Sequence, residues 1–502
     1  MIALRSKIAF LASLAVLTAL ALSVTEQKPP YNIHQKAYYL TPEQVNFVRP
    51  GLVTKIVSAS IDAQGTIQVR FKLTAPRGLA LDRLGVQTPG TVNTSFIAAV
   101  LPRNATQYVS YTSRVSSSPI TNRSATQAVG DSPAGTYQQV AEGEYTYTFT
   151  TKAPAGYDRS TTHAIGVYSS RNLAEFDLGT QYSNDVYNFV PDGSPVRAVR
   201  DIVKTSTCNR CHDPLAMHGG NMRKVELCIL CHQPQTSDPD TGNTVDFPVM
   251  IHKIHMGADL PSVKAGRPYR IIGFNQTVFD FSEVEFPADV RRCVGCHELG
   301  RNAATQATNY LTKPNRAACG ACHDDVNFAT GDKHSDLPQI SDNQCANCHT
   351  PEGELDLDAS IKGAHIVPTQ AKALTGIVFE MVRTADGKPG QKLTVQFRIK
   401  DKAGNPVLPS TMNNLSLIMA GPTVDYGTYV SEDARTATGA ETYSYTFTRA
   451  VPEDAKGTWA VWLQGYKNFQ LLEGTKKEQT VRDIGINKVL YFGVTDATPV
   501  PR

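Results

Sequence analysis

Strict alternation of apolar and polar residues predicts β-strands near both ends of the chain. Residues 67–73 read Ile-Gln-Val-Arg-Phe-Lys-Leu, and residues 393–400 read Leu-Thr-Val-Gln-Phe-Arg-Ile-Lys. A period of two is typical of a strand with one buried and one solvated face. Turn signals such as Asp386-Gly387 follow or precede such segments. Many short strands with turns between them favour sandwiches or small Greek-key-like barrels.

The two ends of the chain are also related by an internal repeat. Residues 143–150 (GEYTYTFT) match residues 441–448 (ETYSYTFT), and residues 184–189 (NDVYNF) match residues 487–492 (NKVLYF). Together with the two alternating segments, these matches occur in the same order in both parts of the chain. We therefore expect two copies of one β-domain.

This repeat predicts the organisation of the chain. The two β-sandwich or Greek-key-like domains are expected at residues 24–200 and 367–502, and they flank an inserted central domain at residues 201–366. A Ser/Thr/Asn-rich insert around residues 106–135 is expected to be a loop of the first copy. The predicted fold class is thus multidomain, with β-domains on either side of a central domain rich in loops and short helices.

The central stretch has too little apolar side chain for an ordinary core. Of its 165 residues from Asp201 to His365, 33 are Leu, Ile, Val or Phe, a share at which a chain is suspected of disorder. No regular apolar period runs through it. Something other than aliphatic side chains must therefore supply its core.

The first residues have the layout of a secretory signal peptide. Arg5 and Lys7 precede an apolar run from Ile8 to Leu22, and cleavage is expected after Ser23. The alternative is an uncleaved membrane anchor, but a run of 15 residues falls short of the roughly 20 that span a bilayer. We expect an exported chain with no transmembrane segment after residues 1–23 are removed.

All the cysteines belong to one repeated motif. The ten cysteines form five C-x-x-C-H units, with none left over. In an exported chain an even cysteine count ordinarily indicates disulfides, but this spacing is that of c-type haem attachment, in which two thiols bind one porphyrin edge. A zinc site would have no use for a His after every pair. We therefore predict five covalently attached c-type haems, bound through Cys208, Cys211, Cys228, Cys231, Cys293, Cys296, Cys319, Cys322, Cys345 and Cys348.

The histidine count predicts the iron ligands. Each motif ends in a proximal ligand, and the same stretch holds five further histidines, so the simplest account gives every iron two imidazoles. The alternative is methionine at some sixth positions, which raises the reduction potential; Met217, Met222, Met250 and Met256 are the candidates. The predicted proximal ligands are His212, His232, His297, His323 and His349, and the predicted distal ligands are His218, His252, His255, His334 and His365.

Two spacings restrict the pairing of these ligands. His252 and His255 are three residues apart, so on a helix they project from one face and should serve two neighbouring irons. His218 follows His212 by only six residues, which favours a different haem for His218. An iron with both axial positions filled relays electrons but has no vacant position for a substrate. The remaining histidines, His34 and His163, are expected to be ordinary hydrogen-bonding residues.

Three segments of the central stretch form a longer pattern: Cys208-x-x-Cys-His-x5-His218-Gly-Gly, the second unit at Cys228 and residues 241–257 (TGNTVDFPVMIHKIHMG). This pattern resembles that of the OmcA/MtrC family of cell-surface multihaem cytochromes. The segments around Tyr145 and Tyr443 are similar to that family as well. The resemblance implies proximal and distal ligands at the ten histidines named above. Relative to the family's decahaem members, the chain corresponds to a single five-haem module with a second β-domain.

The resemblance implies electron transfer to extracellular acceptors, such as metal oxide minerals, flavins or other cytochromes. It places the protein at the cell surface, outside the cell or in the periplasm. The absence of a lipid-attachment cysteine leaves open a secreted shuttle, a periplasmic relay or a subunit that associates into filaments. The net charge of +3 gives no sign of a nucleic-acid partner. A reductase with one open haem, like the pentahaem nitrite reductases, is the alternative, so an electron-transfer protein is favoured over an enzyme and no catalytic residue is assigned.

Overall fold

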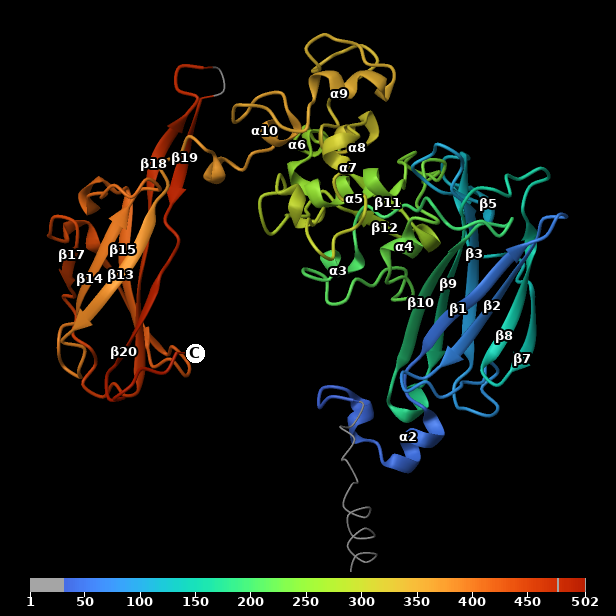
Figure 1. Cartoon of the computed structure of the whole chain (residues 1–502), viewed down its shortest axis with the longest axis horizontal. Helices are drawn as coiled ribbons and strands as arrows, with labels where there is room; N and C mark the ends of the chain where they lie inside the picture. Colours follow the sequence, from blue (N-terminus) through green and yellow to red (C-terminus); the bar gives the residue numbers. More distant parts are fainter. Residues whose placement is uncertain (1–30, 476–477, 502) are drawn as a thin grey trace, which may run out of the picture. The chain divides into compact units, whose positions relative to one another are not determined.

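The computed structural model of the protein describes residues 31–475 and 478–501, and the chain divides into two compact units between Ala346 and Asn347. The first unit holds a β-domain and most of the central stretch, and the second holds the other β-domain (Figure 1). Within the described ranges, no helix is long and apolar enough to cross a membrane. The predicted signal peptide lies outside the described residues. The predicted domain limits stay predictions.

The N-terminal β-domain is a sandwich of two four-stranded sheets. Its core lies between them and is formed by aliphatic and aromatic residues that alternate along the strands, such as Val69, Phe71 and Phe96. Helix α2 (Pro42–Val48) precedes the strands, with Thr41 as its N-cap. The first sheet has the order β1 (Val53–Ile61), β2 (Thr66–Thr74), β8 (Glu144–Lys152) and β7 (Thr136–Ala141); the second has the order β10 (Thr180–Phe189), β9 (His163–Asn172), β3 (Val92–Val100) and β4 (Val109–Ser110); 3-10 turns lie at η1 (Lys36–Tyr39) and η2 (Ala174–Phe176).

The insert at residues 106–135, predicted as a loop, contains strands. Besides β4, strands β5 (Ser113–Ser117) and β6 (Ser124–Ala128) form an antiparallel hairpin. Their side chains are mostly polar and exposed on both faces, so no apolar alternation marks them. The hairpin packs on the loop around Asp240, where Thr121 Oγ1 donates to the Pro239 carbonyl at 3.2 Å. These contacts tie the first β-domain to the central stretch.

The C-terminal β-domain is a second sandwich with its own core. Buried residues such as Phe397, Leu417 and Trp459 come from both of its sheets. One sheet has the order β13 (Val378–Ala385), β14 (Thr394–Lys400) and β17 (Tyr443–Thr446); the other has the order β16 (Thr428–Asp433), β15 (Asn414–Gly421), β18 (Thr458–Leu471) and β19 (Gln479–Ile484), and β20 (Val489–Gly493) also pairs with β18; 3-10 turns lie at η7 (Pro368–Gln370), η8 (Pro409–Thr411) and η9 (Ala434–Thr436).

The two sandwiches repeat each other in strand order and in register. The order β10-β9-β3-β4 corresponds to β20-β18-β15-β16. Phe71 pairs with Tyr145 in the first domain, and Phe397 pairs with Tyr443 in the second. A bulge interrupts the β1–β2 pairing next to Phe71 and the β13–β14 pairing next to Phe397. The predicted internal repeat is therefore present in the structure.

A tyrosine–carboxylate bridge also occurs in both domains. The Tyr147 hydroxyl donates to Asp131 at 2.7 Å, and Asp131 also accepts from two backbone N–H groups near the end of β8. In the second domain, the Tyr445 hydroxyl donates to Glu432 at 2.9 Å, and Glu432 likewise accepts from two backbone N–H groups. Each carboxylate thus satisfies donors at the end of a strand, where the ladder no longer does.

The central stretch consists of short helices joined by loops, as predicted. Its longest helix is α5 (Phe247–Met256). The others in the first unit are α3 (Thr205–Cys208), α4 (Val225–Cys228), α6 (Pro261–Lys264), α7 (Asn309–Thr312) and α8 (Arg316–Cys322), with 3-10 turns η3 (Gly257–Asp259), η4 (Phe274–Gln276), η5 (Cys293–Gly295) and η6 (Asp342–Gln344) and a small hairpin of β11 (Arg270–Ile272) and β12 (Val278–Asp280); α9 (Cys345–Cys348) and α10 (Ile361–Ala364) follow.

The second C-x-x-C-H segment packs directly on the first β-domain. Leu227 and Leu230 lie buried against β3 and β9, in a cluster that includes Ile97 and Ala164. Gly166 in β9 makes this close approach possible, because a Cβ atom there would lie 2.6 Å from Leu227 Cδ1 and 2.8 Å from Leu230 Cδ1. The sheet therefore supplies apolar surface that the central stretch lacks.

Replacing Gly166 with valine should destabilise the first unit by about 1–3 kcal/mol, because the added methyl groups overpack a closed core. Guanidinium unfolding followed by far-UV circular dichroism measures the loss. The control is Ser170→Val, four residues along β9 on the same face but partly exposed, for which a change within about 0.5 kcal/mol is expected. Equal effects of the two variants would contradict the close packing at Gly166.

Candidate haem-binding sites

Helical turns form the C-x-x-C-H motifs. The His212 N–H donates to the Cys208 carbonyl at 2.9 Å, and the same bond links the first Cys and the His of the second, third and fourth motifs at 2.8–2.9 Å. Positions i, i+3 and i+4 of a helical turn lie on one face. Both sulfur atoms and the imidazole of each such motif therefore face the same side, as attachment to one porphyrin requires.

The ten cysteines are chemically available. None is engaged in a disulfide, and each is half-buried or exposed. Burial raises the pKa of the Cys228 thiol and of the Cys231 thiol to about 12, so both are neutral thiols near pH 7. These residues fit thioether attachment, which the disulfide alternative for an exported chain would have prevented.

Six of the predicted iron ligands face each other in pairs. The ring centroids of His212 and His255 lie 6.3 Å apart, those of His218 and His232 lie 5.9 Å apart, and those of His252 and His297 lie 6.4 Å apart. A metal–nitrogen bond of about 2 Å on each side, with about 1 Å from each nitrogen to its ring centre, places two axial imidazoles about 6 Å apart. Each pair has the spacing that one iron between two imidazoles needs.

Helix α5 positions two of these pairs. Pro248 stands in its first turn, and Gly257 ends it with a positive φ of 45°. A Cβ atom at Gly257 would lie 2.1 Å from the Val284 carbonyl oxygen, so a side chain does not fit there. His252 and His255 project from one face of the helix toward His297 and His212, which belong to the third and first motifs. The spacing argument for two neighbouring sites agrees with this arrangement.

Backbone carbonyl groups fix the ring orientation of several histidines. The His232 Nδ1–H donates to the Val245 carbonyl at 2.9 Å, and the His255 Nδ1–H donates to the Ile251 carbonyl at 2.9 Å. Because a carbonyl oxygen only accepts, the proton lies on Nδ1 and the lone pair on Nε2 is left for a metal. The same contact is made at 2.8–3.0 Å by His334 to Leu337, His349 to Ala359 and His365 to Ile361.

Burial keeps the imidazoles neutral. Burial lowers the pKa of His232 to about 4 and that of His252 to about 4, since a charged ring would lose its hydration. Burial also lowers the pKa of His218, whose ring faces that of His232. A neutral imidazole is the form that binds iron, so the environment of these rings fits ligation.

A buried ion pair joins α5 to the fourth motif. Lys253, between the two histidines of α5, has its Nζ 2.6 Å from Asp324 Oδ2, and the two side chains are only 15% and 8% exposed. Asp324 follows His323 and also accepts from the Ser262 backbone N–H at 2.9 Å. Burial opposes ionisation of Asp324, but the hydrogen bonds from Lys253 and Ser262 hold its pKa below the ordinary value. Sequence reasoning missed this pair, since a lone Lys and a lone Asp 71 positions apart carry no motif.

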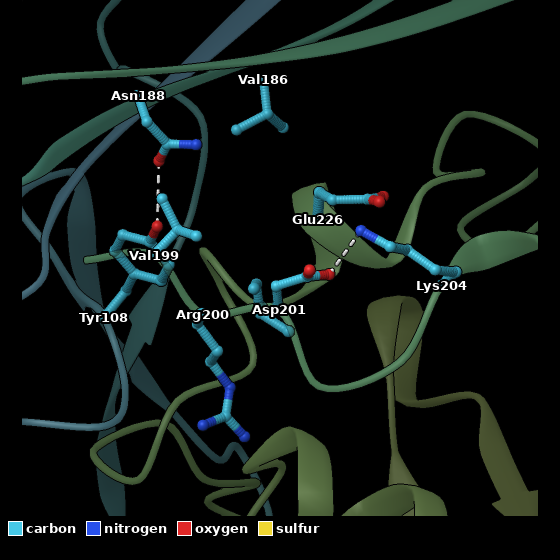
Figure 2. Close-up of a pocket in the computed structure, with 9 residues that line it drawn as sticks. Tyr108, Val186, Asn188, Val199, Arg200, Asp201, Lys204 and Glu226 are labelled. Atoms are coloured by element: carbon cyan, nitrogen blue, oxygen red, sulfur yellow. Dashed lines mark hydrogen bonds and ion pairs between the residues drawn. The ribbon is translucent and has the colours of Figure 1, made fainter. Parts of the chain in front are cut away.

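A polar pocket lies where the first β-domain meets the start of the central stretch. It encloses about 200 Å3 and is lined by residues that include Tyr108, Asn188 and Asp201. The Tyr108 hydroxyl donates to Asn188 at 2.9 Å, and Lys204 pairs with Asp201 at 2.7 Å. Figure 2 shows both contacts as dashed lines. Asp201 also accepts from Thr305, so its charge is already engaged.

The two histidines outside the central stretch have other roles. His163 is buried in the first sandwich, where its Nδ1–H donates to the Thr161 carbonyl at 3.0 Å and its Nε2 accepts from the Tyr111 hydroxyl at 2.8 Å. Both ring nitrogens are therefore satisfied by protein. His34 is exposed near the start of the described chain. The placement of His163 agrees with its interpretation as an ordinary hydrogen-bonding residue.

The central stretch is similar to known cytochrome domains. Residues 200–361 match the family described as outer membrane cytochrome MtrC/MtrF-like, domains II/IV. Over 287 residues the chain is 26% identical to the multiheme cytochrome MtrC of Shewanella baltica (strain OS185), a match that covers 56% of this chain and 38% of that protein. The central stretch is therefore similar to domains II/IV of the MtrC/MtrF-like outer membrane cytochromes. The aligned part spans less than half of the length of the Shewanella baltica MtrC.

Solved structures of OmcA/MtrC proteins share the fold. The outer membrane decaheme cytochrome OmcA matches with a TM-score of 0.60 and 20% identity over 90% of this chain and 73% of OmcA. MtrC from Shewanella baltica OS185 matches with a TM-score of 0.58 and 20% identity over 90% of this chain and 72% of MtrC. The predicted β-domains around a loop-rich and short-helix-rich haem domain are therefore confirmed as a fold.

Proposed function

We propose that the chain carries five c-type haems, each held by two histidines, and passes electrons along them to extracellular acceptors. The observation that carries the proposal is the spacing of three imidazole pairs, 5.9–6.4 Å between ring centroids, each with one member from a C-x-x-C-H motif. His323 and His349 are proposed as proximal ligands of the fourth and fifth haems, with His334 and His365 supplying their sixth ligands.

The haems supply one-electron ferric–ferrous couples when bound. The chain's own residues would attach and orient them: the ten cysteines would bind the porphyrins, and the paired imidazoles would ligate the irons. Backbone carbonyls that accept from Nδ1 would leave Nε2 of those rings to bind iron. The segment around Leu227 packs against β3 and β9 of the first β-domain. With both axial positions filled, this arrangement favours relay of electrons over reduction of a substrate bound to iron.

The proposed acceptors are metal oxides, flavins and other cytochromes, reached after export. The family gives the support, because the relatives named above are outer membrane or multihaem cytochromes. No reductase activity and no filament assembly is part of the proposal. A protein reduced with dithionite should be reoxidised both by free flavin and by suspended ferric oxide, with all five haems returning to the ferric state.

Haem counting and electron paramagnetic resonance test the ligand set. We expect five haems per chain and only low-spin ferric signals in the resting protein. His218→Ala should convert one haem in five to high spin, because the iron at His232 loses its sixth ligand. The exposed His34 provides the control, and His34→Ala should leave all haems low-spin. A high-spin haem in the resting wild-type protein would overturn the proposal in favour of an open site.

A further inference from the structure

Both proposed ligands of one iron lack the backbone hydrogen bond that at least one ligand of every other pair makes. The Nδ1 atoms of His252 and His297 are buried and have no hydrogen-bond partner among the described residues. The Ala307 backbone lies near the His297 ring but does not reach hydrogen-bond geometry. The two rings face each other with centroids 6.4 Å apart. Both orphaned nitrogen atoms therefore belong to one imidazole pair, that of the third motif.

Every other proposed haem has at least one ligand that donates to a carbonyl. His255 makes this bond in the His212 pair, and His232 makes it in the His218 pair. His334 and His365 both donate to carbonyls, so the statement holds whichever of them serves the fourth haem and whichever the fifth. Within the described chain, the third haem site differs from the other four in this respect.

Helix α5 contains an internal comparison. His255 donates to the carbonyl four residues earlier, at Ile251, with a distance of 2.9 Å. The equivalent residue for His252 is Pro248, yet the His252 Nδ1 makes no such bond. Two histidines three residues apart on one helix thus differ in the hydrogen bonding of Nδ1. The difference lies in the protein around each ring and cannot be read from the motif.

The missing bond changes the electronic character of the ligand. An axial histidine that donates its Nδ1–H to a carbonyl is more basic and stabilises the ferric form, which lowers the reduction potential. His252 and His297 lack this effect, and their burial further disfavours the extra charge of the ferric haem. Resting on the bis-histidine ligation proposed above, we propose that the haem held by His252 and His297 has the highest reduction potential of the five. The first electron delivered to the protein then resides at that haem.

A redox titration of the holoprotein tests this inference. Dithionite is added stepwise, and loss of each low-spin ferric signal is followed by electron paramagnetic resonance. In His252→Met, the haem with the highest reduction potential should titrate at a still higher potential, since methionine ligation raises the potential. The highest of the five wild-type waves is then absent. His255→Met, three residues away, should instead remove one of the lower waves. Both variants are first checked for five attached haems.

The outcomes separate the inference from the proposed function. If His252→Met removes a lower wave, the ligation stands and the inference about the potential is overturned. If His252→Met changes no wave and no ligand signal, His252 is not a ligand, and the failure lies in the proposed ligand set itself. Removal of the highest wave by His252→Met alone supports the inference.

A measurement on the wild-type protein serves if the methionine variants do not mature. The rings of His252 and His297 are inclined by 36°, whereas those of His212 and His255 are inclined by 76°. Nearly perpendicular axial imidazoles give a more anisotropic low-spin signal than nearly parallel ones. We expect a signal of the less anisotropic kind to disappear first on reduction. Loss of the most anisotropic signal first would overturn the inference, because the His252 and His297 rings are inclined by only 36°.

Discussion

Without haem, the central stretch should not fold, although both β-domains should. Each sandwich has a closed core, around Phe71 in one and Phe397 in the other. The central stretch has no comparable cluster of its own. Its buried apolar residues around Leu227 pack against β3 and β9 of the first β-domain. A variant with all ten cysteines replaced by serine is expected to have a free energy of unfolding near zero in residues 201–346. Limited proteolysis should cut this region rapidly and leave the β-domains intact.

Tryptophan fluorescence gives the control for this experiment. Both tryptophans, Trp459 and Trp462, lie in β18 of the C-terminal sandwich. The midpoint of their unfolding transition should be the same in the haem-free and haem-loaded proteins. A haem-free central stretch that resists protease as well as the loaded one would contradict the role of the porphyrins as its core.

The strands that sequence reasoning found are those with one buried face. In β2 and β14 every second residue is buried, so alternation was enough to predict both strands and the repeat that relates them. The hairpin of β5 and β6 was not predicted from the sequence because neither of its faces is apolar. Its stability comes from contacts with the loop around Asp240, which lies more than 100 residues later in the chain. The hydrophobic periodicity of a sequence does not reveal contacts between residues so far apart in the chain.

The candidate ligands followed from the motifs, but their partners did not. His252 and His297, for example, are 45 positions apart in the sequence, and their rings face each other only in the folded chain. The backbone carbonyls that accept from the histidine Nδ1 atoms could not be predicted either, because every residue has such a carbonyl and no sequence motif marks the one that is used. The features that distinguish one haem site from another therefore came from the fold, while the number and chemistry of the sites were predicted from the sequence.

Replacing Lys253 with methionine should destabilise the haem-loaded first unit by about 3 kcal/mol, because it leaves the Asp324 carboxylate buried without its cation. The Lys253 and Asp324 side chains are 15% and 8% exposed, and the Lys253 Nζ also lies 5.1 Å from the centre of the Tyr269 ring. Guanidinium unfolding followed at the haem Soret band measures the loss. The two hydrogen bonds from Ser262 to Asp324 remain in the variant and keep the loss at the lower end of the range for broken buried pairs.

The neighbouring pair provides a matched control. Lys333 contacts Asp325 at 2.9 Å, but the Lys333 side chain is 57% exposed, so Lys333→Met should cost much less stability than Lys253→Met. Lys253→Met combined with Asp324→Asn should recover part of the stability, because the neutral amide oxygen still accepts from Ser262 and no unpaired charge is left in the interior. Equal losses for Lys253→Met and Lys333→Met would mean that water reaches Asp324. The link between α5 and the fourth motif would then rest on packing alone.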